Sequence, residues 1–277
     1  MVAKHPLTKL FVYLATLAFF AFFLLPIVWL VLSSFKTSEA ITAARLFPQV
    51  GDLTTANYLE VLKRRDFLTY FGNSLLIALT VSLVTTLLSS LGAYGLSRFS
   101  LRGKPVFLLL ALLPQFFPYV LMLIPFYLLM FKLGLVGTHL GIILAHTSIT
   151  LPFTFWMLTG YFNGIPKELD QAALLDGCSR LGALFRVVLP IAIPGLVVAG
   201  FFAFTVSWSD YLFVSVLSQG VGTATLPIGL QTFLSSIQVR WGLITAGTVL
   251  VVFPTIVLFA VVQRRLVSGL TTGAVKT

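Results

Sequence analysis

Residues 165–196 read IPKELDQAALLDGCSRLGALFRVVLPIAIPGL, a charged segment between two long stretches that contain no Asp, Glu, Lys or Arg. The first part of this segment carries the signals of a short helix. Pro166 suits the first turn, while Glu168 and Asp170 favour the positive end of a helix dipole. Gly177 is then expected to end the helix in a left-handed backbone conformation, which glycine adopts without steric cost.

The second part of the segment predicts another short helix, which begins near Ser179 and ends at Pro190, with Pro194 following. One side of this helix carries four apolar residues: Leu181, Leu184, Phe185 and Val188. Two short helices joined at a glycine form a partly apolar knob outside the lipid. From the pattern alone, docking on another protein and packing on lipid headgroups explain such a knob equally well.

On both sides of the knob, uncharged stretches are long enough to cross a membrane, which takes about 20 apolar residues. Six candidate stretches lie between charged residues: Lys9 and Lys36, Asp66 and Arg98, Lys104 and Lys132, Lys132 and Lys167, Arg186 and Asp210, and Arg240 and Arg264. Glycines at the start of the fourth stretch indicate a turn, so its helix is expected at Leu140 to Asn163. The fifth helix is expected to run past Asp210. The sequence thus predicts an all-α polytopic membrane protein with six transmembrane helices.

The composition agrees with a membrane protein. Of the 277 residues, 58% are apolar and 9% are charged, against about 25% charged in soluble domains. The net charge is +10, but the basic residues are scattered singly, which excludes a basic face for nucleic acid. Cys178 is the single cysteine, so an intrachain disulfide and a multi-cysteine metal site are excluded.

Lys and Arg residues set the expected orientation. Eleven of them fall on the side that holds both termini and seven on the other side, which favours cytoplasmic termini, although the cluster at residues 63–65 argues the other way. The first span, Leu10 to Leu32, is expected to be a retained helix rather than a signal peptide, because it is long and no small-x-small site follows it. The predicted organisation is a cytoplasmic N-terminus at 1–9, a single six-helix transmembrane domain at 10–263 with an external segment at 33–68 and a cytoplasmic segment at 165–194, and a cytoplasmic tail at 264–277.

The spans lack the groups that an enzyme or an ATP-binding protein needs. No G-x-x-x-x-G-K-[ST] motif occurs, so energy has to come from a gradient or from another subunit. Asp210 is the one acidic residue expected inside a span. His139 and His146 are seven residues apart, and packing inside a helix bundle explains them better than metal ligation. We therefore expect no catalytic residues and no metal site.

Several polar and aromatic residues are candidates for a solute pathway. Asp210 is expected to face the bundle interior or water, either as an acceptor for hydroxyl groups of a solute or as a structural partner of Arg240 or of a neighbouring subunit. Trp208, Ser209 and Tyr211 flank it, and the aromatic rings either stack on a solute ring or simply pack. On the third helix, Gln115 and Tyr119 are further candidates, in a region that Pro114, Pro118 and Pro125 are expected to bend.

The knob resembles the "EAA" motif in the membrane subunits of bacterial ABC importers, which reads E-A-A, three residues, G, nine residues and I-x-L-P. Gln171, Ala172, Ala173, Gly177, Leu189 and Pro190 occupy its places, with Asp176 directly before the glycine. The sequence departs from the motif at Gln171, which replaces Glu, and at Val187, which replaces Ile. The resemblance implies that these residues form coupling helices that sit in a cleft of an ATPase subunit.

Other segments resemble the carbohydrate branch of the same importers, specifically the maltose-type second permease subunit. They are Phe35-Lys36, Asn57-Tyr58, Asn73-Ser74, residues 93–99 (AYGLSRF), residues 208–212 (WSDYL) and residues 269–276 (GLTTGAVK). Ser209 departs from the family pattern, which has Asn there. These weak signals occur in the family's order along nearly the whole chain.

The resemblance implies a permease subunit that carries a disaccharide or oligosaccharide across a bacterial or archaeal cytoplasmic membrane by alternating access. The implied partners are a second permease subunit, two ATPase subunits that use ATP and magnesium, an extracytoplasmic sugar-binding protein, and membrane lipid, without nucleic acid. This chain itself needs no cofactor. Glycerol phosphate or a polyol remains an alternative cargo, although a phosphate ordinarily wants Arg in the spans. A secondary carrier independent of ATP and a membrane scaffold are the alternatives of another class.

Overall fold

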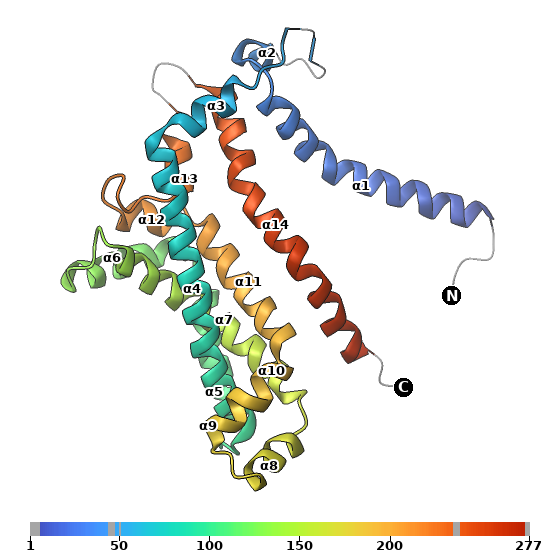
Figure 1. Cartoon of the computed structure of the whole chain (residues 1–277), viewed down its shortest axis with the longest axis vertical. Helices are drawn as coiled ribbons and strands as arrows, with labels where there is room; N and C mark the ends of the chain where they lie inside the picture. The colour runs from blue at the N-terminus through green and yellow to red at the C-terminus, as the bar shows by residue number, and fades with distance from the viewer. Residues whose placement is uncertain (1–5, 44–47, 50, 235–238, 275–277) are drawn as a thin grey trace. The chain divides into compact units, whose positions relative to one another are not determined.

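The computed structural model describes residues 6–43, 48–49, 51–234 and 239–274, with side chains as far as Gln263. Within these residues the regular elements are helices (Figure 1). Their bounds are α1 Pro6–Ser34, α2 Ser38–Thr42, α3 Ala56–Lys63, α4 Arg65–Arg98, α5 Lys104–Leu112, η1 Leu113–Phe116, η2 Tyr119–Met122, α6 Leu123–Lys132, α7 His139–Asn163, α8 Glu168–Leu175, α9 Arg180–Ala183, η3 Leu184–Val188, α10 Leu189–Ile191, α11 Ile193–Ser209, α12 Leu212–Leu217, α13 Leu226–Gln231 and α14 Trp241–Ala274.

The predicted helical membrane fold is confirmed. Among the described residues, four helices are long and apolar enough to cross a membrane: α1, α4, α7 and the Trp241–Gln263 part of α14. Two bent pairs pass the same test together, α5–η1 with η2–α6 at 95° and α9–α10 with α11 at 83°. The described residues thus hold four candidate spans, or six if each bent pair counts as one, and each of the six predicted stretches overlaps with one of them.

The chain forms two compact units. The first comprises residues 1–67 and 230–253, and the second comprises residues 68–229 and 254–277. In the first unit, the amide of Asn57 on α3 donates to the carbonyl oxygens of Ser34 and Lys36, and the hydroxyl groups of Ser34 and Tyr58 lie 2.6 Å apart. Asn57 also lies so close to Gly242 on α14 that a Cβ there would come within 2.5 Å of its side chain. This amide therefore ties α3 to the end of α1 and to the start of α14.

In the second unit, α7 is the most enclosed span. Twelve of its residues are buried, and it packs against α11 and shares two core clusters with α4. Small polar side chains join these helices: Thr85 and Thr150 share a hydrogen bond of 2.9 Å, and Ser82 donates to the carbonyl oxygen of Gly200. Such residues allow close approach of helices in lipid, where apolar burial alone does not drive association. Outside this core, most large apolar side chains are exposed, as expected for a surface that meets lipid or another subunit.

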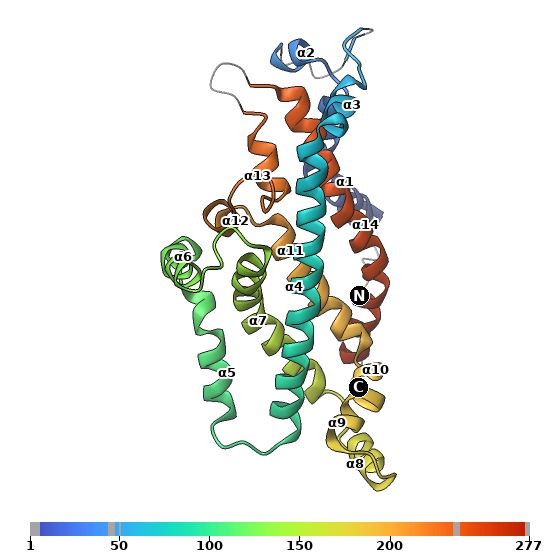
Figure 2. The same ribbon diagram turned by 60° about the vertical axis from the view of Figure 1, so that its left-hand side comes forward.

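The two ends of the second unit differ. In Figures 1 and 2, α8 and α9 lie at the end where α4 finishes and α5 begins, and α12 lies toward the opposite end. The hydrogen bond from Lys104 to Asn163 also places the start of α5 beside the end of α7. We call these the α8 end and the α12 end.

The third predicted helix is bent, as its prolines indicated. Pro114 lies in η1 and Pro118 precedes η2, and the chain turns between them because Phe117 and Pro118 are extended rather than helical. Pro125 causes no break, since it lies in the first turn of α6, where a missing backbone N–H costs nothing.

The prediction that the fifth helix runs unbroken past Asp210 is wrong. α11 begins only at Ile193 and ends at Ser209, and α12 starts after an extended residue, Asp210, with φ −69° and ψ 127°. The physical reason is a hydrogen-bonded cap, which the side chain of Asp210 provides for α12.

Candidate functional site

The first helix of the 165–196 segment ends as its sequence predicts, but it begins only at Glu168 after the N-cap Lys167, so Pro166 lies ahead of its first turn rather than in it. α8 ends at Leu175, and Gly177 has φ +85°. The backbone N–H of Gly177 donates to the carbonyl oxygen of Leu174, and that of Cys178 donates to the carbonyl oxygen of Ala173. These two bonds define the Schellman motif, in which a left-handed residue satisfies the last carbonyl groups of a helix. The glycine therefore fixes the angle at which the second helix leaves the first.

The second helix starts at its expected residue, because Ser179 caps α9 by accepting from the backbone N–H of Gly182 at 3.1 Å. It continues through a π-helical turn, η3, to Ile191, one residue beyond the predicted end. Pro190 does not stop it, since the proline lies in the first turn of α10. The predicted apolar side divides in two: Leu184 and Val188 are fully buried, whereas Leu181 and Phe185 are 61% and 53% exposed.

Both short helices carry exposed apolar side chains, which we call the apolar knob: Leu174, Leu175, Leu181 and Phe185. Leu175 is 89% exposed. Of the residues that match the motif, Gln171, Ala172, Asp176, Gly177 and Pro190 are exposed, Leu189 is half-buried and Ala173 is buried. The knob therefore offers a surface that this unit leaves uncovered.

The side chain of Asp210 is the centre of a second cluster. Its Oδ1 accepts from the backbone N–H groups of Phe213 and Val214 at 3.0 and 3.2 Å, which caps α12. Since the carboxylate satisfies N–H groups that an unbroken helix would bond internally, it stabilises the break between α11 and α12. An Asp just ahead of a short apolar run is a cap signal that the reading of an unbroken span missed.

Two further side chains contact the same carboxylate. Nε2 of His146 lies 3.1 Å from Oδ1, and the hydroxyl group of Tyr119 donates to Oδ2 at 3.4 Å. Nδ1 of His146 lies 2.8 Å from the hydroxyl oxygen of Ser207. An ionised carboxylate only accepts, so Nε2 of His146 is the donor in that state. Because both side chains are at least 95% buried, Asp210 joins α7, η2 and the α11–α12 break inside the bundle.

This arrangement answers which partner Asp210 uses. Arg240 was expected as one candidate, but it forms a bidentate pair with Glu60 of α3, with N–O distances of 2.7 and 2.8 Å. His146, expected to pack as a polar group, is instead the direct partner of the carboxylate. Among the described residues no three His, Cys, Asp or Glu side chains gather in a way that could hold a metal ion.

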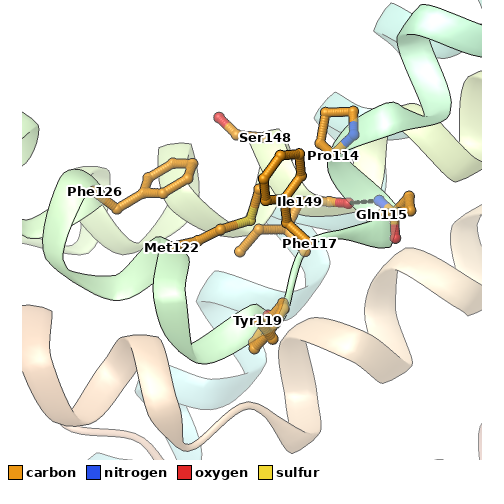
Figure 3. A pocket seen from close by; sticks show the side chains of 8 residues that line it. All are labelled: Pro114, Gln115, Phe117, Tyr119, Met122, Phe126, Ser148 and Ile149. Atoms are coloured by element: carbon orange, nitrogen blue, oxygen red, sulfur yellow. Dashed lines mark hydrogen bonds between the residues drawn. The ribbon is translucent and has the colours of Figure 1, made fainter.

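A cavity of about 280 Å³ opens between η1, η2, α6 and α7 (Figure 3). It is lined by Pro114, Gln115, Phe117, Tyr119, Met122, Phe126, Ser148 and Ile149. The lining is aromatic and aliphatic with three neutral polar groups and no charge. The amide of Gln115 donates to the carbonyl oxygen of Ile149 at 2.8 Å, as the dashed line in Figure 3 shows. Tyr119 forms part of the wall and also contacts Asp210.

The predicted pathway residues are therefore not all in one place. Gln115 and Tyr119 line the cavity, and Asp210 contacts the hydroxyl group of Tyr119 without lining the cavity itself. Trp208 is 2% exposed, with its ring stacked on Phe204 at 5.3 Å. Ser209 is exposed and donates to the carbonyl oxygen of Thr205, and Tyr211 is half-buried. Sequence reasoning missed Ser148 of α7, which also lines the cavity.

Comparison with known proteins identifies the family. Residues 86–272 match the model of the binding-protein-dependent transport system inner membrane component. The chain is 34% identical over 255 residues to the sulfoquinovosyl glycerol transport system permease protein of Agrobacterium fabrum, covering 91% of this chain and 89% of the relative. It is 32% identical to the trehalose transport system permease protein of Mycobacterium tuberculosis, covering 91% and 92%. The arabinooligosaccharides transport system permease protein of Halalkalibacterium halodurans is 33% identical, covering 95% and 94%.

A solved structure shares the fold. A chain of a bacterial ABC transporter involved in the import of the acidic polysaccharide alginate superimposes with a TM-score of 0.82 at 23% sequence identity, covering 95% of this chain and 99% of that one. In this family the membrane subunit is not the ATPase and carries no cofactor, and ATP is used by a partner subunit. The chain belongs to the family of binding-protein-dependent transport system inner membrane components, and is a multi-pass ABC permease subunit of the cytoplasmic membrane.

Proposed function

We propose that the chain is one of two permease subunits that together form the pathway of an ABC importer for a disaccharide or oligosaccharide. Two ATPase subunits bind on the cytoplasmic side, and an extracytoplasmic sugar-binding protein delivers the solute. Both termini are cytoplasmic in this proposal, with the external segment at 33–68, the coupling segment at 165–194 and a tail from 264. Transport proceeds by alternating access in this proposal.

The observation that carries the coupling role is the helix–Gly–helix segment itself. It places four exposed apolar side chains on two short helices whose mutual angle is fixed by the Schellman motif at Gly177. A rigid, exposed apolar surface marks a protein interaction site. The knob therefore has the properties of a part that fits a preformed cleft, and the ATPase subunit is the partner whose energy this permease needs.

Two observations support a carbohydrate as the solute. The relatives named above are permeases for sulfoquinovosyl glycerol, trehalose and arabinooligosaccharides. The cavity next to η2 carries neutral hydrogen-bonding groups beside aromatic rings, which suits hydroxyl groups and the apolar faces of sugar rings. Its lining contains no Arg or Lys, which a phosphate would require.

The test is reconstitution with the chains encoded beside this one. We expect the permease pair to co-purify with a P-loop ATPase, and uptake in proteoliposomes to require both ATP and the binding protein. Accumulation of solute by this chain alone under an ion gradient would instead establish a secondary carrier.

The orientation is tested at Cys178, the single cysteine of the chain. A membrane-impermeant thiol reagent should leave it unmodified in intact cells and label it in inverted vesicles stripped of the ATPase. Labelling from outside would reverse the orientation and remove the coupling role with it.

A further inference from the structure

Asp170 of α8 is buried against the end of α4. Its Oδ2 lies 2.7 Å from Nε of Arg98, the last residue of α4. The N–H of Arg98 is not aimed well enough for a hydrogen bond, so the contact is an ion pair. The Asp170 Oδ1 accepts from the hydroxyl group of Tyr94 at 2.9 Å, one turn earlier on α4. Both oxygens of this carboxylate are therefore engaged by α4.

The contact is closed to solvent. The side chains of Arg98 and Asp170 are 5% and 9% exposed. Nη1 of Arg98 also donates to the carbonyl oxygen of Phe162 near the end of α7, at 3.0 Å. A third contact joins the same parts, since the guanidinium group of Arg180 on α9 lies 4.8 Å over the ring of Phe99. The two short helices are thus fixed to the end of α4 as well as through the chain to α7 and α11.

The energetics of burial make this contact stiff. Two charges buried together are tolerable, but a movement that separates them leaves each charge unpaired in a poorly hydrated place. A displacement of α8 relative to α4 is therefore strongly opposed, whereas a displacement of both together is not. The exposed face of α8, with Gln171 and Ala172, stays free for a partner.

We propose that Arg98 and Asp170 are positioning residues that clamp the first coupling helix to α4, so that a movement imposed on α8 enters this span directly. The inference rests on the proposed coupling role of the 165–194 segment. The chain itself connects the coupling segment to α7 and α11. The ion pair links the segment to a third span, α4, which is distant from it in sequence. At position 171 this chain has Gln where the motif has Glu, and Asp170 supplies a carboxylate one residue earlier.

The experiment uses the complete importer in proteoliposomes and measures complex yield, basal ATP hydrolysis, hydrolysis stimulated by the binding protein, and solute taken up per ATP. Asp170→Asn keeps an acceptor for Tyr94 but removes the ion pair. We expect this complex to assemble and its uptake per ATP to fall about tenfold or more, since breaking a buried pair exceeds the energy of one decade. Glu168→Gln is the matched control, because it removes an exposed carboxylate two residues away on the same helix.

Two further variants separate clamping from simple folding. Arg98→Lys keeps the charge and should retain most of the coupling. The double variant Arg98→Met with Asp170→Leu removes both charges together, which buried pairs often tolerate in stability. We expect it to assemble and still to show the loss in uptake per ATP, because packed apolar side chains do not fix α8 relative to α4 as the ion pair does.

Normal uptake per ATP in an assembled Asp170→Asn or double-variant complex would overturn the clamp. Failure of both complexes to assemble would also overturn it, since the pair would then be a folding requirement only. A failure of the proposed function looks different: the wild-type chain would not co-purify with an ATPase at all.

Discussion

Two buried carboxylates in the same unit are held in different ways. Asp210 accepts from two backbone N–H groups and contacts His146 and Tyr119, all around one break in a span. Asp170 accepts from Tyr94 and faces Arg98 across an ion pair that joins two separate helices. The first carboxylate stabilises a break within one span and contacts the neighbouring elements there, whereas the second joins the short helix α8 to the end of α4. Buried carboxylates in this fold thus stabilise a helix break at the α12 end and a contact between two helices at the α8 end.

The strongest test of this contrast is Asp210→Ala. It removes the cap of α12 and leaves His146 buried without its acceptor, and we expect a loss of about 3–5 kcal/mol in the stability of the permease. Complex yield and the melting temperature in detergent measure the effect. Asp210→Asn keeps an oxygen for the cap and should cost about 1 kcal/mol, with the Michaelis constant for uptake unchanged. A raised Michaelis constant in a well-assembled Asp210→Asn complex would give Asp210 direct contact with the solute and break the contrast.

Gly177→Val tests the coupling segment at the C-terminal end of α8. A β-branched residue in a left-handed conformation costs more than the roughly 1 kcal/mol of alanine, so the chain should remain in the membrane with its ATPase partly bound. Stimulated hydrolysis and uptake should be lost together, because the second helix leaves at a changed angle. Gly72→Ala on α4, where a Cβ has open space, is the control. Wild-type uptake by the Gly177→Val complex would contradict the coupling role.

The cavity is expected to respond to truncation with a smaller and purely local effect. Gln115→Ala removes an amide from the wall, and a lost hydrogen bond to the solute should raise the Michaelis constant several-fold, since one such bond contributes about 1 kcal/mol. Complex yield should not change, because Gln115 is exposed. Phe116→Ala, which removes an exposed ring outside the lining, is the matched control. Equal Michaelis constants for both variants would place the pathway elsewhere.

We expect the smallest effect at the solvent-exposed ion pair of Glu60 and Arg240, which is the reference for the two buried carboxylates, Asp170 and Asp210. The hydrogen bond from Arg240 holds the pKa of Glu60 below its ordinary value of 4.5. Because a lowered pKa stabilises the folded form above the unfolded pKa, this contribution is constant at neutral pH and is lost only as the pH falls below about 4.5.

Glu60→Gln should therefore change stability at pH 7 by less than about 1 kcal/mol, and remove the acid-dependent part of the melting curve below that pH. Thermal melts from pH 7 to pH 3.5 measure both. A larger loss at pH 7 than that of Asp210→Asn would show that exposure does not weaken this pair.

Local sequence determined the helices themselves. Uncharged stretches of sufficient length indicated the spans, because a chain in lipid has to satisfy its backbone hydrogen bonds internally. Gly177 and Ser179 set the end of α8 and the start of α9 as predicted, since each acts on the backbone within a turn of its own position. The bend at Pro114 and Pro118 was likewise readable from the sequence.

Tertiary structure alone decided the partners of the buried charges. His146 lies 64 residues from Asp210 in the chain, and Arg98 lies 72 residues from Asp170, so no pattern along the sequence pairs them. The break at Asp210 combines both: the carboxylate caps α12 through local bonds to Phe213 and Val214, whereas His146 and Tyr119, which contact the same carboxylate, come from distant parts of the chain. The sequence specified which segments are helical because that is a local property of the backbone. Which charges meet depends on how the helices pack, since burial without a partner is too costly for a carboxylate to remain alone.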